Sequence, residues 1–294
     1  MEKGESWNFT EGDEIVPGRL AMRLLGGGIR YEAYLAWDET LYSLVVVKIL
    51  RPGLAVDQRT LRGLRDEAQA LGIVDHPVVM RCFDRVLEGP RPHIVLEHLE
   101  GPRLSTLLRK YGPLPMEQLI PLAVQLCSAL FYMTKREIVH LDVKPRNIIM
   151  AAPPRLIDLS IAKTFEQARS ITTPIGTDAY MAPEQCDPER LGPIGPSADV
   201  WGLGVTLFEA VAGYRPFPDP EVDDSSRRWP QLEAEAYALP EEVPDALAKP
   251  IWACLEPKPE NRPAMDALAE MLEPLVASLP RRPVLNRLRP RWRD

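Results

Sequence analysis

Cysteine and histidine are scarce in this chain of 294 residues, with four of each. No two cysteines stand at the short spacing of a zinc module, so the cysteines and histidines do not form one of the usual structural zinc patterns. The four cysteines also form no disulfide framework of the kind found in small secreted domains. Buried thiols in a reducing compartment are the simplest interpretation, and we expect a cytoplasmic protein.

The chain also lacks an excess of positive charge and an apolar leader. Its net charge of -7 argues against nucleic acid as a partner. Residues 1–18 are polar and acidic, which predicts no signal region. The segment Val200 to Ala212 is strongly apolar, but it is too short to span a bilayer and carries Glu209. We therefore expect no transmembrane segment.

Two regions of different pattern follow the N-terminal extension, residues 1–18. Up to about residue 98, β-branched runs such as Val45-Val46-Val47 predict strands, and one helix is predicted from Asp57 to Val74. From about residue 99 to 279 the apolar spacing is helical, as in Met116 to Met133. Residues 280–294 are rich in arginine and predict a basic tail. A boundary of this kind favours a ligand cleft between the two regions.

The segment from His140 to Met150 carries the strongest chemical signal. Asp142 can accept a hydroxyl proton, and Lys144 can neutralise a phosphate. Asn147 in the same segment and Asp158, after the apolar pair Leu156-Ile157, supply oxygens that suit a metal ion. Together these groups fit phosphoryl transfer, whereas a lone Asp142 would more often make a turn hydrogen bond.

Weaker signals lie upstream of this segment. Gly26, Gly27 and Gly28 would let backbone amides approach phosphate oxygens, although three glycines are more often only a turn. Lys48 ends the Val45-Val46-Val47 run, and a lysine there needs either a charged partner or a route to solvent. Glu67 on the predicted helix is a candidate partner for Lys48.

The run from Gly176 to Glu184 reads Gly-Thr-Asp-Ala-Tyr-Met-Ala-Pro-Glu. With Lys48, Asp142, Asn147 and Asp158, it resembles the protein kinases, and most closely the bacterial eukaryotic-like (Hanks-type) serine/threonine kinases. The similarity extends from about Leu20 to Leu275. It implies a two-lobed α+β kinase fold and a kinase domain over residues 19–279, with the lobes meeting near residues 98 and 99.

This resemblance also implies roles for individual residues. ATP with Mg²⁺, or with Mn²⁺, would bind between the lobes, and serine or threonine hydroxyls of proteins would accept the γ-phosphate. Lys48, held by Glu67, would orient the phosphates, and Thr177 would contact Asp142 and Lys144. Glu184 would pair with Arg262, and Asp199 would brace the catalytic loop. The residues implied for the nucleotide pocket are Gly26, Gly27, Gly28, Ala33, Val46, Lys48, Leu96, Glu97, Leu99 and Ile149.

The sequence departs from the kinase pattern at several positions. Tyr31 stands where a third glycine is usual, and small and large side chains are exchanged at Ala33 and Val46, which predicts a purine slightly displaced in its pocket. Leu141 replaces an arginine that would bind a phosphate on the activation loop, and Leu159-Ser160 replaces Phe-Gly. We therefore expect activity that does not require activation-loop phosphorylation.

Two alternatives to an active protein kinase are open at this stage. A pseudokinase would bind nucleotide or act as a scaffold, but the full charged set from Lys48 to Asp158 argues against lost catalysis. A small-molecule phosphotransferase would lack Thr177 and the Ala182-Pro183-Glu184 run.

Overall fold

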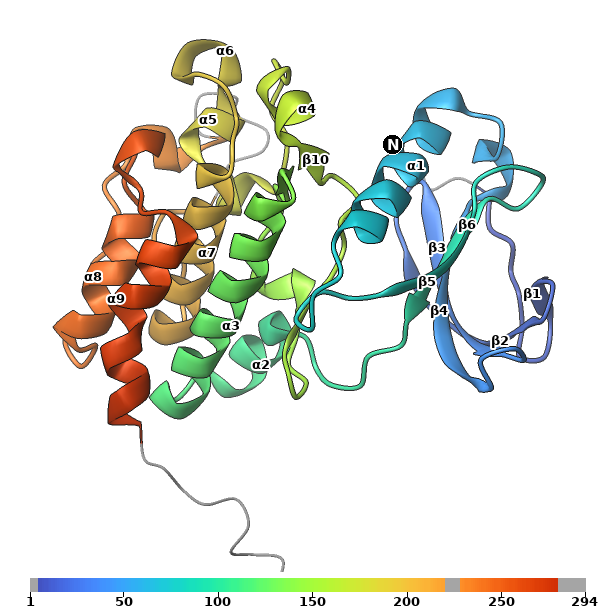
Figure 1. The fold of residues 1–294 in the computed structure, drawn as a ribbon, viewed down its shortest axis with the longest axis horizontal. Coiled ribbons are helices and arrows are strands. Elements are labelled where there is room, and N and C mark those ends of the chain that lie inside the picture. The colour runs from blue at the N-terminus through green and yellow to red at the C-terminus, as the bar shows by residue number, and fades with distance from the viewer. Residues whose placement is uncertain (1–4, 220–227, 280–294) are drawn as a thin grey trace, which may run out of the picture.

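A computed structural model of the chain describes residues 5–219 and 228–279. The predicted basic tail, residues 280–294, lies outside this range. The described residues form two lobes, one built on a sheet and one helical, as Figure 1 shows. The predicted two-lobed α+β fold is confirmed.

The first lobe is a twisted antiparallel sheet in the order β1-β2-β3-β4-β6-β5, with helix α1 packed beside it (Figure 1). Its elements are β1 (Glu14–Val16), β2 (Arg19–Gly27), β3 (Tyr31–Asp38), β4 (Ser43–Leu50), α1 (Gln58–Ile73), β5 (Cys82–Val86) and β6 (His93–Glu97). Helix α1 begins as predicted, because the Asp57 side chain accepts a hydrogen bond from the Thr60 amide at 2.7 Å.

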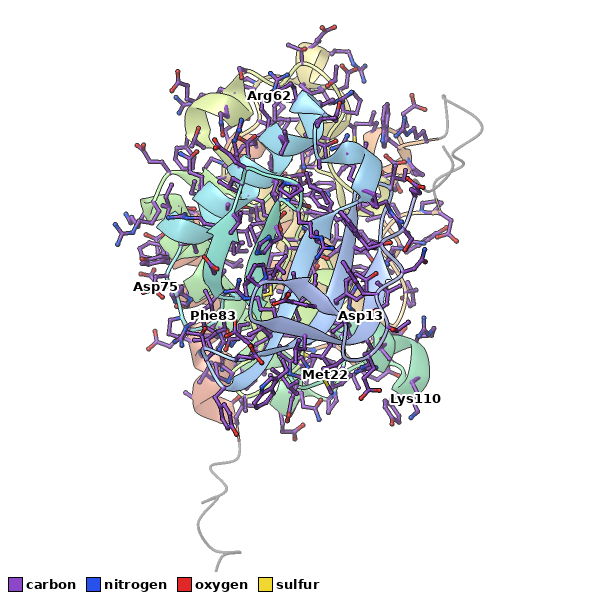
Figure 2. All side chains as sticks on the ribbon, turned by 90° about the vertical axis from the view of Figure 1, so that its right-hand side faces the viewer. Asp13, Met22, Arg62, Asp75, Phe83 and Lys110 are labelled. Atoms are coloured by element: carbon purple, nitrogen blue, oxygen red, sulfur yellow. The ribbon has the colours of Figure 1, made fainter. Side chains whose placement is uncertain are left out.

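Part of the predicted N-terminal extension belongs to this lobe. Strand β1 pairs with β2, and Ile15 and Val16 are buried in a small core with Tyr34. The Trp7 indole donates a hydrogen bond to the Leu50 carbonyl oxygen at 2.7 Å. Figure 2 looks onto this end of the molecule, where Met22 and Phe83 are partly exposed on the sheet.

The second lobe contains helices and short strand pairs. Its helices are α2 (Leu104–Tyr111), α3 (Met116–Lys135), α4 (Phe165–Arg169), α5 (Pro183–Cys186), α6 (Pro188–Leu191), α7 (Ser197–Ala212), α8 (Asp245–Cys254) and α9 (Met265–Ser278). The paired strands are β7 (Ile138–Val139) with β10 (Lys163–Thr164), and β8 (Ile148–Ile149) with β9 (Arg155–Leu156). Short 3₁₀ turns include Pro145–Asn147. This turn belongs to the segment from His140 to Met150, which is called the catalytic segment below.

Helix α7 is the central element of the second lobe. Nearly all of its side chains are buried. A Cβ atom on Gly204 would lie 2.5 Å from the Cβ of Cys254, so glycine is required for α7 and α8 to pack this closely. The main core runs from α7 through Leu159 to Leu64 and Leu71 of α1, so the two lobes share apolar contacts.

One described helix passes a simple membrane test. Helix α3 is long and apolar enough to cross a bilayer by length and composition, and half of its most apolar window is buried inside the protein. It contacts α7 and α9. Among apolar segments, only Val200 to Ala212 was weighed above as a possible span. Burial against two other helices is the behaviour of a core helix.

Candidate active site

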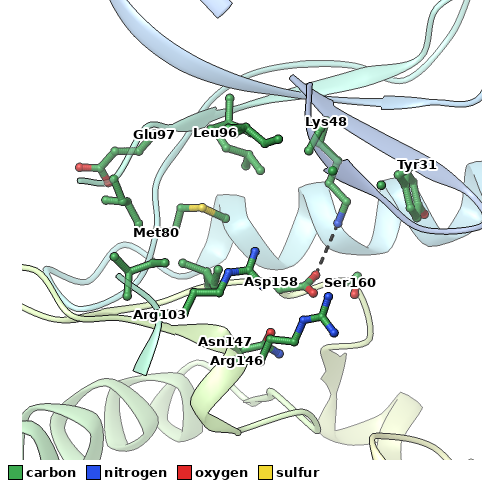
Figure 3. Close-up of a pocket in the computed structure, with 18 of the residues that line it drawn as sticks. Tyr31, Lys48, Met80, Leu96, Glu97, Arg103, Arg146, Asn147, Asp158 and Ser160 are labelled. Atoms are coloured by element: carbon green, nitrogen blue, oxygen red, sulfur yellow. Dashed lines mark hydrogen bonds and ion pairs between the residues drawn. The ribbon is translucent and has the colours of Figure 1, made fainter. Parts of the chain in front are cut away.

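A cavity of about 780 Å³ lies between the two lobes. Strands β2, β3 and β4 cover it, the connection after β6 closes one side, and the catalytic segment forms the floor (Figure 3). All of the residues that the sequence analysis assigned to nucleotide binding line it, as do Asn147, Asp158, Glu67 and Lys144. Asp142 and Thr177 are not among its lining residues.

Lys48 is held inside the cavity by two acidic groups. Its Nζ atom lies 2.7 and 2.8 Å from the two carboxylate oxygens of Glu67 on α1, and 3.5 Å from Oδ1 of Asp158. Burial alone would lower the pKa of Lys48, but the charges of Glu67 and Asp158 outweigh it and raise the pKa. Lys48 therefore stays protonated, with its charge available to an anionic ligand.

Asp158 is an anion at any ordinary pH. Burial raises the pKa of its carboxyl, but the charge of Lys48 and a hydrogen bond from Ser160 lower it to about 2. Its backbone has a φ of 68°, a strained value for a residue other than glycine. The next residue, Leu159, is completely buried in the core between the lobes, where it fills the apolar slot expected from the sequence.

The glycine-rich hairpin joins β2 to β3. Gly26 has a φ of 150°, and a Cβ atom on Gly27 would lie 2.6 Å from the Tyr31 carbonyl oxygen, so both positions require glycine. The Tyr31 ring covers Lys48, with Nζ 4.8 Å from the ring centre. This contact was not predicted, because Tyr31 was identified from the sequence only as a departure from the glycine pattern.

The opposite end of the cavity suits a flat apolar group. Ala33 on β3 and Val46 on β4 both line it. Leu35 pairs with Val46 in the sheet, and Ala33 pairs with Lys48, so Ala33 and Val46 are diagonal neighbours on one face. Leu96, Leu99 and Ile149 complete this end, while the Glu97 carboxylate binds Arg155 at 2.7 Å.

Asp142 is the centre of a compact polar network. Its Oδ1 atom accepts a hydrogen bond from the Thr177 hydroxyl at 2.7 Å, and its Oδ2 atom is 2.7 Å from Lys144 Nζ. Lys144 also donates to the Thr177 hydroxyl oxygen. The Asn147 amide nitrogen donates to the Asp142 carbonyl oxygen at 3.0 Å and to Oδ2 at 2.9 Å. The contacts predicted for Thr177 are confirmed.

Other buried contacts hold this network in place. The Asp199 carboxylate accepts hydrogen bonds from the backbone amides of His140 and Leu141 at 2.7 and 2.8 Å, which confirms its predicted bracing contact. Leu141 is buried and has a φ of 66°, so the catalytic segment adopts a strained turn that these bonds stabilise. The predicted pair of Glu184 and Arg262 is bidentate and buried, at 2.6 and 2.9 Å.

Residues 20–272 match the protein kinase domain, and the chain belongs to this family. Its similar relatives are bacterial serine/threonine kinases, as the sequence predicted. PknB of Mycobacterium tuberculosis is 31% identical over 264 residues, which cover 86% of this chain and 41% of that protein. PrkC of Bacillus subtilis is 33% identical over 200 residues, which cover 67% of this chain and 30% of that protein. The chain thus spans less than half the length of these relatives.

Two features near the site had no clear signal in the sequence. Lys163 on β10 forms an ion pair with Asp66 on α1 at 2.6 Å, and these residues are far apart in the chain. Arg103 and Arg146 both line the cavity floor. Arg146 lies between Lys144 and Asn147 in the segment from His140 to Met150. Its positive charge at that place was the only sign in the sequence that it could contribute to the site.

Proposed function

We propose that this protein is an ATP-dependent serine/threonine protein kinase that transfers the γ-phosphate to protein hydroxyls. One observation carries the proposal: Lys144 and Asn147, which bind Asp142, line the same interlobe cavity as the Lys48–Glu67 pair, one set from each lobe. Phosphoryl transfer needs both, because it depends on positioning the acceptor and on stabilising phosphate charge.

The donor set for a divalent metal fits this proposal. The Asn147 amide nitrogen is bound to Asp142, which leaves the amide oxygen on the side of Asp158 in Figure 3. An amide oxygen and an ionised carboxylate are ligands that Mg²⁺ prefers, and Mn²⁺ accepts them as well. In the described part of the chain no cluster of three or more His, Cys, Asp or Glu side chains could hold a metal. Phosphate oxygens and water would therefore complete the coordination.

Each polar group then has one task. Lys48, fixed by Glu67, binds the α- and β-phosphates, and the amides of Gly26, Gly27 and Gly28 cover them. Asp142 aligns the acceptor hydroxyl and takes its proton. Lys144 stabilises the negative charge on the phosphate during transfer, and Thr177 holds the side chains of Asp142 and Lys144 in position. The apolar end with Ala33, Val46, Leu96, Leu99 and Ile149 holds the purine.

The function is tested by following labelled γ-phosphate from ATP into the protein itself and into generic acidic and basic acceptor proteins. We expect transfer by the wild type and a loss of at least about a hundredfold in Lys48→Met, since the variant lacks the phosphate-binding charge. Lys110→Met, on an exposed lysine labelled in Figure 2, is the matched control. Bound ATP without any transfer by the wild type would favour the pseudokinase alternative.

We propose further that activity does not need a phosphate on the activation segment, which runs from Asp158 to Glu184 and contains Ser170, Thr172 and Thr173. The Asp66–Lys163 ion pair already joins this segment to α1. The buried Gln185 side chain donates to the carbonyl oxygens of Leu141 and Ile175 at 2.9 Å each, which ties the segment to the catalytic loop. Leu141 cannot bind a phosphate. These contacts supply, without modification, the links that a phosphorylated residue would make.

A variant with Ser170, Thr172 and Thr173 all changed to Ala is expected to keep wild-type transfer activity. Asp66→Asn is expected to lower the rate by at most about fivefold, because a partly exposed ion pair contributes roughly 0.2–1 kcal/mol. Exchange of the charges, Asp66→Lys with Lys163→Asp, is expected to restore it. The rate of phosphate transfer at saturating ATP, measured for the triple variant and for the Asp66 and Lys163 variants, checks both expectations. An inactive triple variant that is rescued by restoring one phosphorylated residue would contradict the proposal.

A further inference from the structure

Two arginines on the floor of the cavity have no carboxylate partner. Arg103 directly precedes α2, and Arg146 lies in the turn Pro145–Asn147. Both line the cavity, and Figure 3 shows their side chains reaching into it from the second lobe. Within residues 5–219 and 228–279, neither side chain forms an ion pair or a hydrogen bond. Other arginines of the protein, such as Arg155 and Arg262, do pair with carboxylates.

Arg23 on β2 also lines the cavity, and most of the other charges there are compensated. Lys48 pairs with Glu67 and Lys144 with Asp142, each at 2.7 Å. Glu97 pairs with Arg155. Asp158 is the proposed metal ligand. The charge left over on the floor is therefore positive, although the whole chain has a net charge of -7.

The backbone holds both arginines in fixed positions. Arg103 forms a β-bridge with Ile149, and the Met150 amide donates to the Pro102 carbonyl oxygen at 2.8 Å. Gly101 allows this approach, because a Cβ atom there would lie 2.7 Å from the Met150 carbonyl oxygen. Partial burial lowers the pKa of Arg103 and the nearby charge of Arg146 lowers it further, while the charge of Asp158 acts in the opposite direction without cancelling them. An anion bound by both arginines would remove this repulsion.

The position of the pair favours the acceptor peptide over the nucleotide. Lys48 and Lys144, which we assign to phosphates, have side chains only 15% and 13% exposed. Arg103 and Arg146, on the same floor, are exposed to solvent. Arg146 also belongs to the same loop as Asp142, where the acceptor hydroxyl must lie. An extended peptide advances about 3.3 Å per residue, so side chains close to the acceptor in sequence reach this floor.

We propose that Arg103 and Arg146 form an anionic subsite that selects serine and threonine acceptors flanked by an acidic side chain. The inference rests on the proposed kinase function. A guanidinium group binds a carboxylate or a phosphate through two parallel hydrogen bonds, so aspartate, glutamate or an already phosphorylated residue can occupy the subsite.

The test uses an alanine-based peptide with a single threonine. Glutamate, phosphoserine or arginine is placed in turn at each flanking position. The enzymes compared are the wild type, Arg103→Glu with Arg146→Glu, and the milder Arg103→Gln with Arg146→Gln. Arg62→Glu is the matched control, since Figure 2 shows Arg62 on the outer surface of α1, away from the cavity lining. The quantities measured are kcat/KM for each peptide, KM for ATP, and the Kd of each fluorescent peptide.

For the wild type, kcat/KM is expected to be at least about tenfold higher for the best glutamate peptide than for the neutral peptide. The double glutamine variant loses this preference and the double glutamate variant favours arginine peptides. Because both arginines line the interlobe cavity, KM for ATP can also change in these variants, but by less than the peptide preference. The phosphoserine peptides show whether phosphate binds better than carboxylate. Equal kcat/KM for all wild-type peptides, or a raised KM for ATP with peptide preference unchanged, would overturn the proposal.

Failure of the kinase function is distinguishable from failure of the subsite. If the wild type transfers no phosphate to any peptide, the kinase proposal fails. The Kd values of the peptides then decide whether Arg103 and Arg146 form an anionic subsite. Tighter binding of glutamate peptides by the wild type, lost in the double variants but not in Arg62→Glu, supports the subsite. Equal Kd values for acidic, neutral and basic peptides refute it.

Discussion

Asp142→Asn is expected to lower kcat for phosphate transfer by about 10²- to 10⁴-fold, the usual contribution of a general base. Asparagine has nearly the same shape but cannot take a proton from the acceptor hydroxyl. It also offers one oxygen where Asp142 uses two, to bind Thr177 on one side and Lys144 and Asn147 on the other. The Kd for ATP is expected to stay unchanged, because Asp142 does not line the interlobe cavity proposed to hold the nucleotide.

The measurement is single-turnover transfer to a peptide, with ATP affinity determined separately by calorimetry. Asp75→Asn, on an exposed residue labelled in Figure 2, is the matched control and is expected to behave as wild type. Full activity of Asp142→Asn would refute the proposed mechanism. A large loss of ATP affinity in this variant would instead indicate that the loop had rearranged.

Arg262→Leu is expected to lower the free energy of unfolding by about 3–5 kcal/mol, because it leaves the Glu184 carboxylate buried without a partner. The two side chains are 0% and 1% exposed. The Arg262 guanidinium also donates to the carbonyl oxygens of Glu256, Ser197 and Pro257 and lies 5.0 Å from the ring centre of Trp201. These carbonyl oxygens would lose a donor in the same substitution.

Chemical denaturation monitored by tryptophan fluorescence measures the effect. Arg190→Leu is the matched control, since its pair with Asp187 is on the surface and its loss is expected to cost about 0–1 kcal/mol. Arg262→Leu combined with Glu184→Leu is expected to recover part of the stability, because no unpaired charge is left inside. A cost for Arg262→Leu no larger than for Arg190→Leu would show that the pair is not a main support of the second lobe.

The fold and the local parts of the site could be predicted because their signals are short-range. Asp57 marks the start of α1, and Val45-Val46-Val47 marks a strand. Asp142, Lys144 and Asn147 lie within one loop, so their spacing alone brings them together. The end of α1 was also predicted to within one residue, at Val74, where the helix ends at Ile73.

What the sequence did not predict depends on contacts between distant segments. Nothing in the local pattern around Asp66 indicates that its partner is Lys163, since the pairing needs α1 and β10 to be placed by the whole fold. In the same way, Arg103 and Arg146 share one surface only because the segment before α2 forms a bridge with β8. Tyr31 covers Lys48 because the pairing of β3 with β4 makes the two residues diagonal neighbours on one face of the sheet.

The Asp66–Lys163 pair has a consequence for the time course of signalling. A carboxylate fixed in the sequence cannot be added or removed on demand, so under the proposed function a phosphatase would find no activating group to hydrolyse. The output of such an enzyme would follow its copy number. Its signal would then fade over the time needed for dilution by growth or for proteolysis, and reversible modification would not shorten it.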